Sequence, residues 1–117
     1  MTRRLAAVFA LALAATLATA TGSDDWKPIS IALQPMQTHE ECMRVEAGEK
    51  RRYHWKSDAP VDFNIHYHRD TEAFYPVKIA GMRGDGGTFA AKTGEDYCWM
   101  WTARDRPARI EGRLETK

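Results

Sequence analysis

Short stretches in which apolar and polar residues alternate recur along this chain and predict β-strands. The clearest is Val61–His68, Val-Asp-Phe-Asn-Ile-His-Tyr-His, in which every second residue from Val61 to Tyr67 is apolar. A period of two places these residues on one face of a strand and the intervening polar residues on the other. The pattern therefore predicts a half-buried strand whose polar face carries His66 and His68.

The same alternation predicts further strands at residues 29–33, 41–46, 51–57, 74–79, 88–91, 97–102 and 108–114. Ala-Gly-Glu-Lys separates the second and third of these segments and predicts a hairpin between them. Gly81–Gly87 holds four glycines in seven residues and predicts a long flexible connection. No apolar stripe of helical period lies outside the N-terminal segment. We therefore predict an all-β fold, an antiparallel β-sandwich of about seven to eight short strands.

The N-terminal segment has the pattern of a secretory signal peptide. Arg3 and Arg4 precede the apolar run Leu5–Leu17, and Ala18-Thr19-Ala20 has the form of a cleavage site. The run is shorter than the roughly 20 apolar residues of a transmembrane anchor. We therefore predict a signal peptide at residues 1–20, cleaved from a bacterial periplasmic protein with no transmembrane anchor. Residues 21–40 are then an N-terminal lead with the first strand, and residues 41–117 the sandwich.

Cleavage leaves enough residues for one domain of balanced charge. The full chain has 17 Lys and Arg against 16 Asp and Glu, and loss of Arg3 and Arg4 gives a net charge of −1. A near-neutral chain with both signs interspersed argues against nucleic acid or an anionic membrane as partner. The two cysteines, Cys42 and Cys98, form an even count in an oxidising compartment, which favours a disulfide over free thiols.

Several motifs, in order, resemble the GOLD domain, the Golgi-dynamics β-sandwich of secretory cargo receptors. They are Glu-Cys-Met-Arg-Val-Glu from residue 41, a Gly-Glu-Lys turn, Arg-Tyr-x-Trp, Val-Asp-Phe-Asn-Ile and Gly-Glu-Asp-Tyr-Cys-Trp-Met-Trp from residue 94. The resemblance implies a non-catalytic sandwich that binds proteins or lipids. It also implies a disulfide from Cys42 to the later strand, where Met100 occupies the family's cysteine position and Cys98 lies two residues earlier. The printed sequence shows no coiled coil or membrane helix like those of the receptors, so we do not expect their trafficking role to transfer.

The most concrete binding hypothesis is a soft-metal site. His66-x-His68 and Cys98-x-Met100 each place two potential ligands on one strand face. Imidazole, thiolate and thioether together favour copper over hard cations. We therefore expect these four residues to bind or handle copper if the two strand faces coincide.

Each of these residues also has a simpler interpretation. Two histidines on a polar strand face are often solvated side chains, and Met100 is often a core gap-filler. Cys98 cannot be a ligand while it is oxidised. If one face of the sheet packs on the core and the other faces solvent, one side of residues 97–102 must point outward. Tyr97, Trp99 and Trp101 are then either core residues or an exposed aromatic binding patch.

The sequence does not indicate an enzyme. It has no Ser nucleophile in a strand-turn-helix context, no paired carboxylates on one strand and no His-Glu-x-x-His helix. We therefore expect an exported, non-catalytic binding module. Its ligand is expected to be a soft metal such as copper or, alternatively, a protein or lipid bound without metal.

Overall fold

The computed structural model describes residues 12, 14, 15 and 25–117. The predicted signal peptide lies almost wholly outside the described residues, and nothing in the structure bears on it. In the described part of the chain, no helix is long and apolar enough to cross a membrane.

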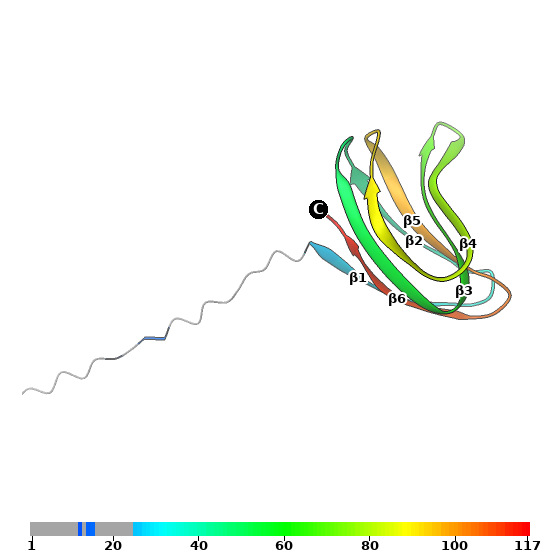
Figure 1. The fold of residues 1–117 in the computed structure, drawn as a ribbon, viewed down its shortest axis with the longest axis horizontal. Helices are drawn as coiled ribbons and strands as arrows, with labels where there is room; N and C mark the ends of the chain where they lie inside the picture. The colour runs from blue at the N-terminus through cyan, green and yellow to red at the C-terminus, as the bar shows by residue number, and fades with distance from the viewer. Residues whose placement is uncertain (1–11, 13, 16–24) are drawn as a thin grey trace, which may run out of the picture.

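The described chain forms six antiparallel strands and no helix, which confirms the all-β prediction. Their order in the sheet is β1-β6-β3-β5-β2, with β4 paired to β3. The sheet curls on itself, so that two layers enclose the core (Figure 1). The strands are β1 (Trp26–Leu33), β2 (Thr38–Val45), β3 (Lys50–Arg69), β4 (Glu72–Ala90), β5 (Glu95–Ala103) and β6 (Ala108–Glu115).

Strand β3 belongs to both layers. Its first part, Tyr53–Ser57, pairs with β6, and its later part, Val61–His66, pairs with β5. The bend between them lies at residues 58–60, where the Asp58 side chain accepts a hydrogen bond from the Arg109 amide at 2.8 Å. Two predicted strands are therefore one long strand that changes layers.

Strand β4 follows β3 through the same bend, so the prediction of a flexible Gly81–Gly87 connection is wrong. Residues 84–87 pair with β3, and register shifts in the ladder mark the bend on either side of Met82. Gly81 has a φ of +66°, a conformation that favours glycine, and its amide donates to Asp62 Oδ1 at 2.9 Å. The glycine-rich stretch thus allows β4 to bend, and eight predicted strand segments become six strands.

The predicted hairpin of residues 41–46 and 51–57 is also wrong. Strand β2 pairs with β5, whereas the first part of β3 pairs with β4 and β6. The turn between β2 and β3, with Gly48 at a φ of +85°, therefore carries the chain from one layer to the other. The apolar residues of both segments point into the core between the layers. The two segments therefore lie on opposite sides of the core and form no backbone pairing with each other.

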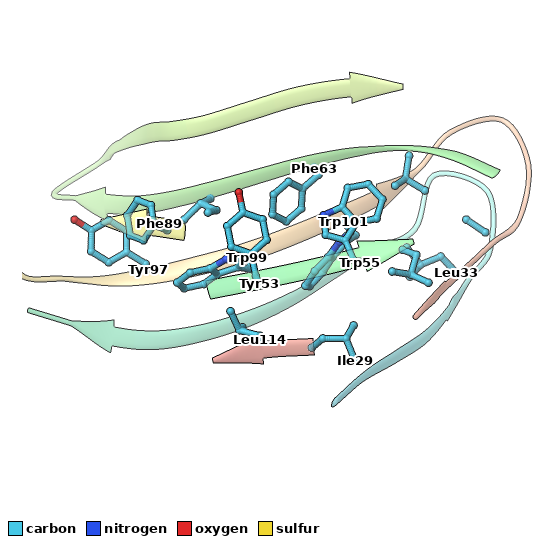
Figure 2. Close-up of a cluster of buried hydrophobic side chains, with 14 of the residues drawn as sticks. Ile29, Leu33, Tyr53, Trp55, Phe63, Phe89, Tyr97, Trp99, Trp101 and Leu114 are labelled. Carbon is cyan, nitrogen blue, oxygen red and sulfur yellow. The ribbon is translucent and has the colours of Figure 1, made fainter. Parts of the chain in front are cut away.

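Aromatic side chains fill the space between the layers (Figure 2). Trp99 is 0% exposed, and Tyr97 and Trp101 are 1% and 2% exposed. The hypothesis of an exposed aromatic patch on these three residues is therefore wrong. Trp55 and Phe63 from the two parts of β3 pack on one another, with ring centroids 5.3 Å apart. Because this face of β5 is buried, its other face, with Cys98 and Met100, points outward.

Candidate functional site

The outer face of the β2-β5-β3 layer carries all four predicted metal ligands. In this layer Cys98 lies between Cys42 and His66, each its direct register partner. Met100 lies in the next row, and His68 follows His66 on the same face of β3. The structure therefore places both pairs on one face, as the copper hypothesis requires.

Cys42 and Cys98 form a disulfide across β2 and β5, as predicted. Cys42 is exposed and Cys98 half-buried. As a half-cystine, Cys98 has no thiolate to offer a metal, so in the oxidised protein it leaves the predicted ligand set.

His66 is the unexpected member of this face, because its side chain is only 4% exposed. Its Nδ1 lies 2.7 Å from Asn64 Oδ1, and its Nε2 lies 3.2 Å from Glu40 Oε1. The rings of His68 and Tyr75 cover it, with centroids 5.1 and 5.6 Å away. Side chains from β2, β3 and β4 thus enclose one imidazole on a face that is otherwise open to solvent.

The enclosure of His66 predicts that stability falls in mild acid. Burial lowers the pKa of His66 below its ordinary 6.5, the carboxylate of Glu40 opposes this, and His68 adds to it. The unfolded chain therefore binds the proton more readily, so the contribution of neutral His66 is full above 6.5 and is lost as the pH falls toward the lowered pKa. We expect urea unfolding of His66→Gln to show a weaker loss of stability below this pH than the wild type.

The control for the His66 experiment is His54→Gln, which removes an exposed imidazole from the opposite layer. It should keep the wild-type pH profile. An unchanged profile in His66→Gln would contradict the expectation.

The geometry gives the copper hypothesis no direct support. In the described part of the chain, one group of at least three His, Cys, Asp or Glu side chains has all its ligand atoms within 4.8 Å of one another: Glu40, Cys42 and Cys98. Neither His66 nor His68 belongs to it. Copper binding through the histidines and Met100 thus stays a hypothesis.

A second candidate site is a groove of about 490 Å³ between the two parts of β4. Aromatic rings dominate its lining, among them Tyr67, which stacks on Phe74, and Phe89, which packs edge-on against Tyr97. Burial, followed by the charge of Asp85 and its hydrogen bond, raises the pKa of Tyr53 in the groove to about 12. Its hydroxyl therefore stays protonated at neutral pH. Backbone groups also border the groove, because β4 pairs with no described strand except β3.

On the opposite side of the molecule, β1 and β2 form the edges of the two layers. An ion pair between side chains of these two strands bridges the layers there. Lys27 on β1 pairs with Glu41 on β2, which also accepts from His39 Nε2 at 2.8 Å. The two open sides of the curled sheet thus differ, since polar side chains bridge one and the aromatic groove occupies the other.

Sequence reasoning named His66, His68, Cys98 and Met100 as candidate ligands and did not name Glu40, Asn64 or the groove. Glu40 lies just before the strand predicted at residues 41–46, and Asn64 looks like an ordinary solvated residue on a polar strand face. The signal for Glu40 was its spacing of two from Cys42, which puts both on one face. The groove had no sequence signal, because it forms only when β4 bends.

A comparison with protein-family models finds no match, so it gives the resemblance to the GOLD family no support. A comparison with curated proteins also finds no match. Among solved structures, the chain is similar to PliG of Aeromonas hydrophila, described as a periplasmic lysozyme inhibitor of g-type lysozyme. The TM-score is 0.52 at 9% identity, over 78% of this chain and 85% of PliG. A de novo designed double-stranded β-helix gives 0.42 at 14% identity, over 76% and 96% of the two chains. The likeness to PliG shows the fold.

Proposed function

We propose that this protein is an exported, non-catalytic module that binds another protein and that the β4 groove is its contact surface. The groove carries the proposal, because it combines exposed aromatic area with an edge strand on one open side of the sheet. Aromatic residues are enriched in protein interfaces, and a strand edge offers backbone groups to an extended partner segment.

The fold likeness supports a protein partner over a metal or a lipid. PliG is described as a periplasmic inhibitor of g-type lysozyme, an activity that needs binding and no catalysis. The signal pattern at residues 1–20 is consistent with the same compartment. We therefore take an exported cell-wall-degrading enzyme of the g-type lysozyme class as the concrete partner.

The groove makes a direct prediction for Phe74→Ala. Phe74 is half-buried at the groove and stacks on Tyr67 with ring centroids 5.1 Å apart. We expect the purified protein to inhibit lysis of peptidoglycan by a g-type lysozyme. Phe74→Ala should weaken binding at least about tenfold, since central aromatic residues dominate interface energy. Calorimetric titration and a turbidity assay of lysis measure both quantities.

Met82→Ala is the matched control, because Met82 is an exposed apolar residue of the same strand outside the groove lining. It should bind like the wild type, and circular dichroism should show that both variants are folded. If the wild type neither binds nor inhibits the lysozyme, the proposal of a lysozyme partner is wrong. If Phe74→Ala and Met82→Ala lose the same amount of binding affinity, the proposal that the groove is the contact surface is wrong.

The alternative is copper binding by the oxidised protein through His66, His68 and Met100. Titration of Cu(I) and Cu(II) into the wild type and the His66→Ala/His68→Ala double variant tests it. Equally weak binding by both proteins would exclude this site and leave the protein partner.

A further inference from the structure

We propose that reduction of the Cys42–Cys98 disulfide uncovers a site for a zinc-class cation, formed by the two thiolates with Glu40 and His66. These four side chains come from three neighbouring strands of one outer face. The site differs from the copper hypothesis because it uses both cysteines and Glu40, and neither His68 nor Met100. It is independent of the proposed protein-binding groove.

The backbone already places the two sulfurs for a shared ion. Cys42 and Cys98 are direct register partners with Cα atoms 4.0 Å apart. Two thiolates on one tetrahedral Zn²⁺, with Zn–S of about 2.3 Å, lie roughly 3.8 Å from each other. Because the ladder fixes the two strands on either side of this pair, reduction requires only the side chains to separate. Glu40 shares the face of Cys42, and its carboxylate oxygen lies within 4.8 Å of both sulfurs.

His66 has the orientation of a supported ligand. Its Nδ1 lies 2.7 Å from the buried Asn64 Oδ1, which accepts a hydrogen bond in the tautomer that carries the ring hydrogen on Nδ1. In this tautomer Nε2 carries the lone pair, and a cation bound between Nε2 and the Glu40 oxygen, now 3.2 Å apart, would take the place of a ring proton. Metal-binding histidines are held in this way, by a second partner that accepts from the other ring nitrogen. His66 is also the register partner of Cys98, so the imidazole and the thiolate leave neighbouring positions on adjacent strands.

The reduction needs an external dithiol. Its thiolate attacks the exposed Cys42 sulfur, breaks the S–S bond and expels Cys98 as thiolate, and its second thiol then releases Cys42 by forming its own disulfide. Two electrons pass from the dithiol to the cystine, and its two protons are taken up by the new thiols. Binding of the cation returns these two protons to solvent, because the ligands are thiolates.

The experiment compares the full chain in its oxidised and dithiol-reduced forms. We expect the reduced protein to bind one equivalent of Zn²⁺, and Co²⁺ in its place to show thiolate-to-metal charge transfer and tetrahedral visible bands. The oxidised protein should show neither. Zn²⁺ should also raise the melting temperature of the reduced form and leave that of the oxidised form unchanged, since a ligand of the native state stabilises it.

Variants separate this site from chance binding at the surface. His66→Ala and Glu40→Gln should each weaken Zn²⁺ binding by the reduced protein at least about tenfold, because loss of a group that merely supports a ligand already costs about that much. His54→Ala, on the opposite layer, should bind like the wild type. Equal Zn²⁺ affinity in oxidised and reduced protein would overturn the proposal, and so would unchanged affinity in both site variants. Neither outcome bears on the lysozyme assay, which uses oxidised protein.

Discussion

Replacement of Cys42 and Cys98 by alanine is expected to lower the free energy of unfolding by about 4 kcal/mol. The disulfide joins residues 56 positions apart and closes a loop that contains all of β3 and β4. A cross-link of this span removes much of the conformational freedom of the unfolded chain, which is the main source of the effect in the chain-entropy model. Urea unfolding of the oxidised wild type and the double variant measures the difference.

Thr38→Ala/Thr102→Ala is the matched control for the disulfide. These residues are register partners on the same two strands, and their hydroxyl oxygens lie 3.0 Å apart. Loss of this non-covalent pair should cost about 1 kcal/mol. A loss in the cysteine variant no larger than that of the threonine pair would contradict the role given to the cross-link.

Trp99→Ala is expected to destabilise the protein by about 3–5 kcal/mol, the usual cost of deleting a buried aromatic side chain. Trp99 is fully buried on β5 and packs edge-on against Tyr53 and Phe89, which come from the opposite layer. Its loss therefore leaves a cavity between the layers that the rigid strands cannot close. Thermal and urea unfolding of the variant check this value.

Trp99→Phe is the informative companion. Phenylalanine keeps most of the ring contacts and also removes the indole N–H, which is buried with no hydrogen-bond partner in the described part of the chain. A buried donor without a partner carries a desolvation cost, so this substitution recovers part of what its smaller volume loses. We expect a clearly smaller loss than in Trp99→Ala. Since both variants lack this N–H, similar losses would contradict the stabilising role given to the ring contacts that phenylalanine keeps.

The fold class follows from the sequence because alternation is a local property. Val61, Phe63 and Ile65 are all buried as their period of two predicts, and the burial of Trp99 and Trp101 settles which face of β5 points outward. The compartment inferred from Leu5–Leu17 also favoured the disulfide that the structure contains. The strand signals and the signal-peptide pattern are each carried by residues that are close together in the chain.

Pairing and bending were not predictable in the same way. The sequence of residues 41–57 does not distinguish a hairpin turn between two paired strands from a turn that connects strands of different layers. The same turn residues suit both connections. Gly81 signals a departure from ordinary strand geometry, but a loop and a bend use the same residue type. From the sequence alone His66 is expected to be solvated. It is buried because Glu40 and Tyr75, from other strands, contact its side chain.

The passage of β3 and β4 through both layers has a consequence for how the molecule comes apart. Since β3 and β4 each run through both layers, with register shifts at the bend, opening of one layer disturbs strands that the other layer also uses. The backbone amides of Tyr53, Trp55, Phe63 and Ile65 therefore belong to a single cooperative unit on both sides of the bend. In hydrogen exchange they should be released together, at the rate of global opening, whereas the β1 edge exchanges earlier through local fraying.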